Sequence, residues 1–344
     1  MKIVTLLPAA TEIICDLGLS KNLCGISHEC DYPLQAKDKI RVTSSIISKS
    51  TSQNKIDSIV KGAIEQSLPI FEIDNEKILE INPDLIITQG LCEVCSISKD
   101  KIEAKFNQIP CTLFNKTKVI SLNGKTFSDI CEDIIRIGEI VGKEEIARKL
   151  INEAKQKSKN ITNKRINKSL LLLEWIEPYF TPGHWIPEQI EMSGFLSSVG
   201  KKGEKSREIL SEEISSLNPD YIGLICCGYN LEENKTFAQN IYNDTNINHL
   251  DVVKKENIYA FDSNSYFTRP SLRIVEGAIQ LNDAMITSIT VKKVIVDKLQ
   301  ETLHLLVYPL FGVLRSQKVV NPSLVYQQKK HHLLQSLQRK LFFY

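Results

Sequence analysis

Cysteine and histidine side chains gather where the sequence predicts strands to end. One half of the chain carries an H-x-C and a C-x-x-C, and the other a histidine and a vicinal cysteine pair. Thiolate and imidazole prefer zinc, cobalt or iron to hard cations. Two hypotheses stay open: a soft-metal site, or buried thiols that bind nothing. The metal candidates are His28, Cys30, Cys92 and Cys95, with His184, Cys226 and Cys227 in the second half.

Aromatic residues are concentrated in the same loops. Both tryptophans, Trp175 and Trp185, lie in one loop that also contains proline and glycine. Such a loop is a poor place to bury two indole rings without a partner surface. Either a flat, partly apolar ligand or packing between two lobes explains them. Arg269 would fix an anionic edge of the ligand or pair with a carboxylate of the protein. The aromatic candidates for ligand binding are Phe180, Trp185, Tyr229, Tyr266 and Phe267.

The elements that must position these residues are repeated in the sequence. The segments 78–87 (ILEINPDLII) and 214–223 (ISSLNPDYIG) match 136 positions apart. Each reads as a helix end, an Asn-Pro-Asp turn and a buried strand. Alternating strands and helices predict an α/β fold of two Rossmann-like lobes with parallel sheets. In folds of this kind ligands bind beyond the carboxyl ends of the strands. The loops expected there add Pro8, Ala9, Thr11, His28, Gln89, His184 and Cys227 to the ligand-binding candidates.

A helix is expected to join the lobes. Apolar residues at helical spacing from Phe127 to about Lys159 predict one long helix, continuous or interrupted. Such a helix is a stiff connector that allows small rocking of the lobes. The expected organisation is an N-terminal lobe over 1–124, a connecting helix over 125–162, a C-terminal lobe over 163–286 and a loosely ordered basic extension over 287–344.

The net charge of +2 hides two unlike parts. Residues 287–344 carry nine Lys or Arg against two Asp or Glu, so the rest of the chain is acidic. An acidic body argues against nucleic acid as a partner, because such binding needs a concentrated basic face. Contact of the extension with a membrane surface stays open beside a loosely ordered alternative.

The compartment is inferred from the cysteines and the N-terminus. Nine cysteines, an odd number, suit a reducing compartment. Glu12 and Asp16 interrupt the first apolar run, so it does not read as a signal peptide. We expect a cytoplasmic protein, or a periplasmic one if it is exported by an unrecognised route. No nucleophile elbow, Walker loop, dinucleotide-binding glycine motif or H-E-x-x-H is present, so no enzyme is expected.

Seven short motifs follow one another along the chain: Leu7-Pro-Ala-Ala-Thr-Glu12, His28-Glu-Cys-Asp-Tyr-Pro33, Asn82-Pro-Asp-Leu85, Leu91-Cys-Glu-Val-Cys95, Glu177-Pro-Tyr-Phe-Thr-Pro-Gly183, Gly183-His-Trp-Ile-Pro-Glu188 and Phe267-Thr-Arg-Pro270. With these motifs the chain resembles, over about residues 2 to 285, a known family, the class III substrate-binding proteins of ABC importers. This is the fold of periplasmic vitamin B12- and ferric-siderophore-binding proteins. The motifs that begin at His28, Leu91 and Gly183 look like a subgroup usually labelled cobalamin-binding, which often lacks an export signal.

The resemblance implies a monomeric, non-catalytic protein that requires no cofactor and binds a cobalamin-like corrinoid or a related metal chelate in an interlobe cleft. Its partner would be an ABC transporter permease dimer. Glu76 and Glu212, which occupy equivalent positions in the repeat, would dock on transporter arginines; complementing a helix dipole is the simpler role for each. Ser44, Ser45 and Gln89 stand where vitamin B12-binding relatives carry tryptophans. The rival hypothesis is a cytosolic Cys/His metal-binding enzyme or metallochaperone, with Zn, Co or Fe, on the same scaffold.

Overall fold

The computed structural model describes residues 1–48, 51–66, 70–90, 116–162 and 165–284. The chain divides into two compact units, Met1–Asn282 and Asp283–Tyr344, and the first unit contains both predicted lobes. The expected basic extension lies outside the described residues. Within the described ranges no helix is long and apolar enough to cross a membrane.

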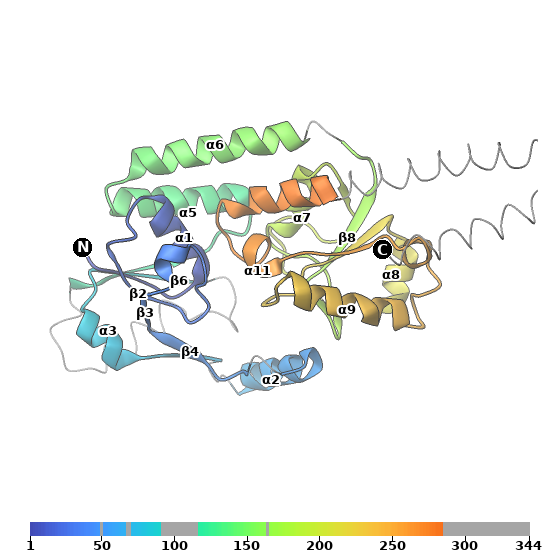
Figure 1. Ribbon diagram of the computed structural model, residues 1–344, viewed down its shortest axis with the longest axis horizontal. Coiled ribbons are helices and arrows are strands. Elements are labelled where there is room, and N and C mark those ends of the chain that lie inside the picture. Colours follow the sequence, from blue (N-terminus) through green and yellow to red (C-terminus); the bar gives the residue numbers. More distant parts are fainter. Residues whose placement is uncertain (49–50, 67–69, 91–115, 163–164, 285–344) are drawn as a thin grey trace, which may run out of the picture. The chain divides into compact units, whose positions relative to one another are not determined.

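The N-terminal lobe is built on a parallel sheet with strand order β3-β2-β1-β6-β7 (Figure 1). Its central strands are buried on both faces, which explains their continuous apolar sequence. The strands β1 and β6 pair residue by residue without a shift in register: Ile3 pairs with Leu85 and Thr5 with Ile87. The strands are β1 (Ile3–Thr5), β2 (Leu23–Ile26), β3 (Ile40–Arg41), β6 (Leu85–Gln89) and β7 (Lys118–Leu122), and β4 (Thr43–Ser45) pairs separately with β5 (Phe71–Ile73). The helices are α1 (Pro8–Asp16), the 3-10 turn η1 (Leu34–Ala36), α2 (Gln53–Glu65) and α3 (Asn75–Ile81).

The C-terminal lobe repeats this architecture with strand order β11-β8-β12-β13, again parallel. Strand β12 fits closely beside β8, because a Cβ on Gly223 would lie 2.4 Å from the Leu172 side chain. The strands are β8 (Ser169–Leu173), β11 (Leu196–Ser197), β12 (Tyr221–Leu224) and β13 (Ile258–Ala260), with a hairpin of β9 (Trp175–Ile176) and β10 (Tyr179–Phe180). The helices are α7 (Ile186–Met192), α8 (Ser211–Leu217), α9 (Leu231–Asn243), α10 (Asp251–Lys254) and α11 (Ser263–Tyr266), followed by a helix over 273–284.

The repeat found in the sequence is a repeat in structure. Helix α3 leads into β6, and α8 leads into β12. Both helices end at an asparagine in the left-handed conformation, Asn82 with φ 48° and Asn218 with φ 41°. Asparagine tolerates this conformation, and the proline that comes next cannot continue a helix. The prediction of two α/β lobes with parallel sheets is confirmed.

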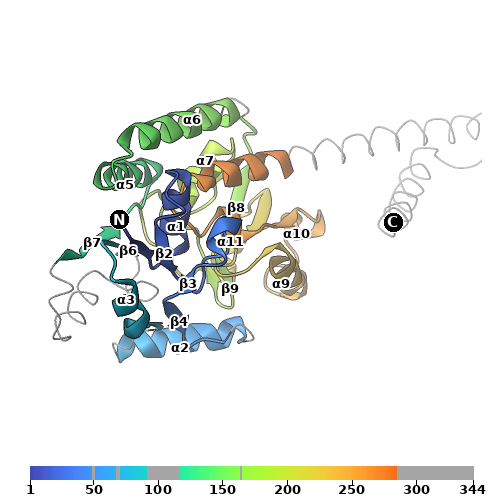
Figure 2. The same cartoon turned by 60° about the vertical axis from the view of Figure 1, so that its left-hand side comes forward.

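The segment expected as one connecting helix is interrupted and folds back on itself. A capping box between Thr126 and Asp129 starts α5 (Phe127–Ile140), and the chain reverses through Gly142 before α6 (Glu144–Thr162). The two helices lie side by side in both views (Figures 1 and 2). Their close approach depends on Gly138, where a Cβ would lie 2.9 Å from that of Ala147. The limits of the lobes and of the connector stay a prediction.

Candidate functional site

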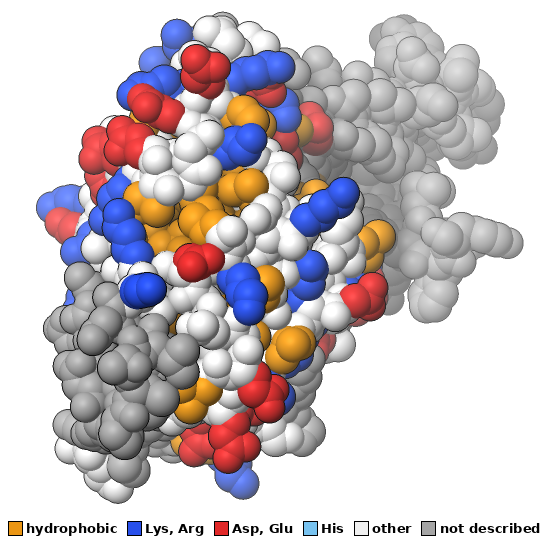
Figure 3. Space-filling model, turned by 90° about the vertical axis from the view of Figure 1, so that its left-hand side faces the viewer, with side chains coloured by type: hydrophobic (Ala, Val, Ile, Leu, Met, Phe, Trp, Pro, Cys, Tyr) orange, Lys and Arg blue, Asp and Glu red, His pale blue; other side chains and the backbone are white. Residues whose placement is uncertain are grey.

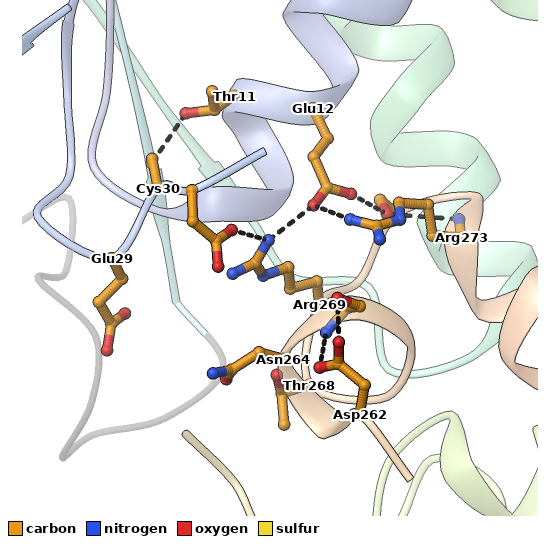
Figure 4. Close-up of polar contacts among 12 residues, drawn as sticks. Thr11, Glu12, Glu29, Cys30, Asp262, Asn264, Thr268, Arg269 and Arg273 are labelled. Carbon is orange, nitrogen blue, oxygen red and sulfur yellow. Dashed lines mark hydrogen bonds and ion pairs between the residues drawn. The ribbon is translucent and has the colours of Figure 1, made fainter. Parts of the chain in front are cut away.

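A buried ionic network joins α1 of the N-terminal lobe to the segment after α11 (Figure 4). Glu12 Oε1 accepts hydrogen bonds from Arg269 Nη1 (3.1 Å) and Arg273 Nη1 (3.0 Å), and its Oε2 accepts one from Ser271 Oγ (2.7 Å). Arg269 Nη1 also lies 2.6 Å from Asp31 Oδ1. The Glu12 side chain is 1% exposed and that of Arg269 7%. Arg269 is therefore paired with protein carboxylates in this structure, which is the second of its two predicted roles, and its contact with a ligand stays a prediction.

Aromatic rings of both lobes enclose the second arginine of this network. The Arg273 guanidinium lies 4.1 Å from the centre of the Tyr32 ring and 5.1 Å from that of Tyr266. These are cation–π distances. Tyr266, a predicted ligand contact, is half-buried and already engaged with Arg273.

The predicted metal ligands His28 and Cys30 have different partners. Cys30 is 1% exposed and its Sγ lies 3.0 Å from Thr11 Oγ1. Burial raises the pKa of the Cys30 thiol to about 11. The hydrogen bond with Thr11 lowers this pKa, but by less than burial raises it. His28 Nδ1 instead lies 2.7 Å from Thr43 Oγ1, and its ring packs on Phe71. Both side chains are thus engaged with groups of the protein, and their role as metal ligands stays a prediction.

No three His, Cys, Asp or Glu side chains in the described part of the chain are grouped as a metal site would require. Cys92 and Cys95 lie outside the described residues. The metal hypothesis therefore depends on residues whose positions are not described.

The C-terminal lobe carries a partly exposed aromatic surface, made by Trp175 and Tyr229. Their ring centroids are 5.7 Å apart, and Tyr229 packs edge-on against Phe237 at 4.8 Å. Trp175 Nε1 donates to the Glu177 carbonyl, which fixes the indole. We call Trp175 and Tyr229 the aromatic surface. Tyr229 was predicted as a ligand contact; Trp175 belonged to the same sequence cluster.

Other predicted contacts are buried and offer no surface to a ligand in this structure. Trp185 is 6% exposed and its Nε1 donates to the Phe267 carbonyl at 2.8 Å, while Phe267 is 1% exposed. Ala9 and Thr11 are 0% exposed because they face the core side of α1. The side chains of these four residues pack inside the lobes, and their direct contact with a ligand stays a prediction.

The remaining predicted ligand contacts are at least partly accessible. Cys227 is exposed, directly after the buried Cys226, whose pKa burial raises to about 12. His184 has a positive φ of 52°, and its pKa is lowered by burial and then by Lys125 and Lys205. The half-buried members are Pro8, His28, Gln89, Phe180, His184, Tyr229 and Tyr266.

Helix α2 supplies contacts that the sequence did not predict. Gln53, at its first turn, is 4% exposed, and its Oε1 accepts a hydrogen bond from Ile176 N at 3.2 Å. Asn54 Nδ2 donates to Glu177 Oε2 at 3.0 Å. The N-terminal lobe thus reaches the loop after β8. No signal in the sequence indicated these contacts, because they join residues more than 120 positions apart.

The two expected docking carboxylates occupy the same position in equivalent helices. Glu76 follows the N-cap of α3 by two residues, and Glu212 follows the N-cap of α8 by two. Both side chains are exposed. The face shown in Figure 3 carries mixed charge, with Lys and Arg interspersed with Asp and Glu among the described residues. The docking role stays a prediction.

Family comparison agrees with this architecture. A model of the periplasmic binding protein family matches residues 3–265. The chain belongs to this family.

Similar proteins extend the comparison. An uncharacterised ABC transporter substrate-binding lipoprotein of Bacillus subtilis, YvrC, is 23% identical over 293 residues, or 83% of this chain and 79% of its own. The vitamin B12-binding protein of Vibrio cholerae is 24% identical over 228 residues, or 64% of this chain and 69% of its own. The crystal structure of the periplasmic heme-binding protein HutB of Vibrio cholerae superposes with a TM-score of 0.62 at 16% identity, covering 83% of this chain and 98% of its own.

Proposed function

We propose that this periplasmic binding protein carries an uncharged, amide-bearing metal chelate of the corrinoid type between its lobes and delivers it to an ABC transporter. Among its relatives, the curated vitamin B12-binding protein and the heme-binding structure bind different chelates. The charge of the groups facing the ligand separates these alternatives.

The observation that carries the proposal is the neutralisation of the interlobe arginines. Arg269 and Arg273 are paired with the carboxylates of Glu12 and Asp31, so the two positive charges are balanced by two negative ones. Both guanidinium groups of this network are therefore engaged with carboxylates of the protein rather than with a carboxylate of heme. Figure 4 shows the uncharged side chains of Asn264 and Thr268 near this network, together with the carboxylates of Glu29 and Asp262, and Asn264 N donates to the carbonyl of Tyr229 in the aromatic surface. The uncharged side chains and the aromatic surface suit the peripheral amides and apolar faces of a corrinoid.

The experiment is an absorption titration of the purified protein with cyanocobalamin, hemin and a ferric siderophore, read together with the thermal midpoint. Binding at 100 times Kd stabilises a folded protein by about 2.7 kcal/mol, so a specific ligand raises the midpoint. We expect cyanocobalamin to do so and hemin not to. Saturable hemin binding without any response to cyanocobalamin would overturn the proposal.

Transport rather than catalysis is the role that the family supports. Family members are substrate-binding transport proteins. The lipoprotein relative favours the exported alternative over the cytoplasmic expectation. We propose that Glu76 and Glu212 are the contacts with the permease dimer, because they are exposed and equivalent on the two lobes.

A further inference from the structure

Among the described residues, two sets of side-chain contacts join the lobes, and they differ in burial. The first is the network around Glu12, in which Glu12 and Arg269 are 1% and 7% exposed and Asp31 is 57% exposed. The second is made by α2. Its Gln53 bonds to Ile176 N, its Asn54 to Glu177, and its Lys61 Nζ lies 3.9 Å from Glu208 Oε2. Lys61 and Glu208 are each about half exposed, at 53% and 49%.

The free energies of these two sets decide which one opens. Removing one partner of a buried ion pair leaves an uncompensated buried charge and is strongly destabilising, whereas an exposed pair contributes little. The described apolar side chains of helix α2 add limited packing, because Ala63 is buried but Ile56, Ile59 and Val60 are only half-buried. Local opening begins where buried apolar contacts are few. The α2 contacts therefore break while the Glu12 network holds.

Gln53 makes the buried part of the α2 contact. Its side chain is 4% exposed, its Oε1 accepts the hydrogen bond from Ile176 N, and its amide also hydrogen-bonds the side chain of Cys226. Lifting α2 therefore breaks this buried polar contact together with the exposed contacts of Asn54 and Lys61.

Lifting α2 uncovers the region predicted to meet the ligand. Ile176, which Gln53 contacts, follows Trp175 of the aromatic surface directly. Glu177, which Asn54 contacts, also accepts a hydrogen bond from Asn240 of α9 at 2.8 Å, so α2 rests on the same loop as the aromatic surface. Figure 1 shows α2 extending from the N-terminal lobe beyond β4 toward α9.

We propose that α2 is a strap laid from the N-terminal lobe across the edge of the aromatic surface, and that it must lift from the C-terminal lobe to admit the ligand. The buried Glu12 network stays intact during this motion and keeps the lobes aligned. The ligand's identity rests on the proposed function; the motion of α2 does not.

The first test needs no ligand. Hydrogen exchange of the α2 amides is compared between the unmodified protein and the double variant Asn54→Ala, Glu208→Gln. Alanine favours helix, so the double variant loses contacts to the C-terminal lobe without weakening α2 itself. Two exposed contacts predict exchange that is about two- to thirty-fold faster in residues 53–65, with α5 unchanged. Ser58→Ala is the matched control, since Ser58 is exposed on the same helix and donates only to the Asn54 carbonyl. Equal α2 exchange in all three proteins would overturn the strap.

The second test measures cyanocobalamin association by stopped flow. The double variant is expected to bind faster by a similar factor, and Ser58→Ala at the unmodified rate. An unchanged association rate in a double variant with faster exchange would show that α2 opens but does not guard the site, and would overturn the proposal. If the unmodified protein does not bind cyanocobalamin at all, the proposed function fails and the exchange result alone decides the strap.

Discussion

The Arg269 guanidinium and the Glu12 carboxylate lie 3.1 Å apart, although 257 positions separate them in the chain. Glu12 belongs to α1 and Arg269 follows α11, so this pair joins the two lobes. Both groups are buried, and each has a second charged partner, Arg273 for Glu12 and Asp31 for Arg269. The network therefore sets how the lobes face each other.

Replacing Arg269 by methionine should destabilise the fold by about 3 kcal/mol, near the lower limit for a broken buried pair, because Arg273 still compensates Glu12. Urea unfolding measures the change. Arg148→Met is the control, since its pair with Glu144 is exposed and should contribute less than about 1 kcal/mol. The double change Glu12→Gln, Arg269→Met should recover part of the loss. A loss no larger than that of the control would contradict a structural role for the network.

Replacing Glu76 and Glu212 together by alanine should abolish stimulation of the partner transporter while chelate affinity stays unchanged. Each carboxylate lies in a first helical turn and contributes about 0.3–1 kcal/mol to stability, so the variant should fold. Transporter ATPase activity and a ligand titration are measured side by side. Glu80→Ala, on the last turn of the same α3, should leave both readouts unchanged. Full stimulation by the double variant would rule out the docking role.

Alkylation of native protein at pH 8 should reach Cys227 well before Cys30 and Cys226. Cys227 is exposed, whereas burial raises the pKa of Cys30 to about 11 and that of Cys226 to about 12. Only the thiolate reacts, and its fraction at Cys30 is on the order of one in a thousand. Peptide mass mapping after timed iodoacetamide treatment follows each cysteine, and unfolded protein provides the upper limit. Rapid labelling of Cys30 in the native protein would contradict its buried contact with Thr11.

Stability should fall as pH rises from about 4.5 to about 7 through the contribution of Glu174. Burial raises the pKa of this carboxyl from 4.5 to about 7, opposed by hydrogen bonds from Gly183 and Ser206. The folded protein therefore binds the Glu174 proton more tightly than the unfolded chain does. The resulting stabilisation is fully present below about pH 4.5 and is lost as the pH rises through about 7. Glu174→Gln should flatten this part of the stability profile measured by urea unfolding. An identical slope in both proteins would assign the pH dependence to other groups.

Much of the fold was predictable from local patterns. The Asn-Pro-Asp repeat located α3–β6 and α8–β12, because a helix ending in left-handed asparagine before proline leaves a strong signal. The turn that separates α5 from α6 was less visible. Apolar spacing continues on both sides of Gly142, and only the close contact of Gly138 with α6 reveals that the helices pack together.

The site was harder to predict, because it depends on partners that are distant in the sequence. Aromatic residues in a loop can face a ligand or pack inside a lobe; Trp185 is buried in the lobe, whereas Trp175 is partly exposed. Arg269 could contact an anion or pair with a carboxylate, and in this structure it pairs with Glu12 and Asp31. The contacts of Gln53 with Ile176 could not be read from composition or periodicity, since amphipathic spacing shows that a helix packs but not on what.

The Glu12 network also determines when α1 can be fully buried during synthesis of the chain. Ribosomes add about 5–20 residues per second, so the arginine that neutralises Glu12 is made roughly 13–50 seconds after α1. Until then Glu12 lacks the two arginines that pair with it. The surface of α1 that packs against the second lobe stays hydrated. The N-terminal lobe can form early, but its first helix completes its burial only when nearly all of the chain as far as residue 273 has been made.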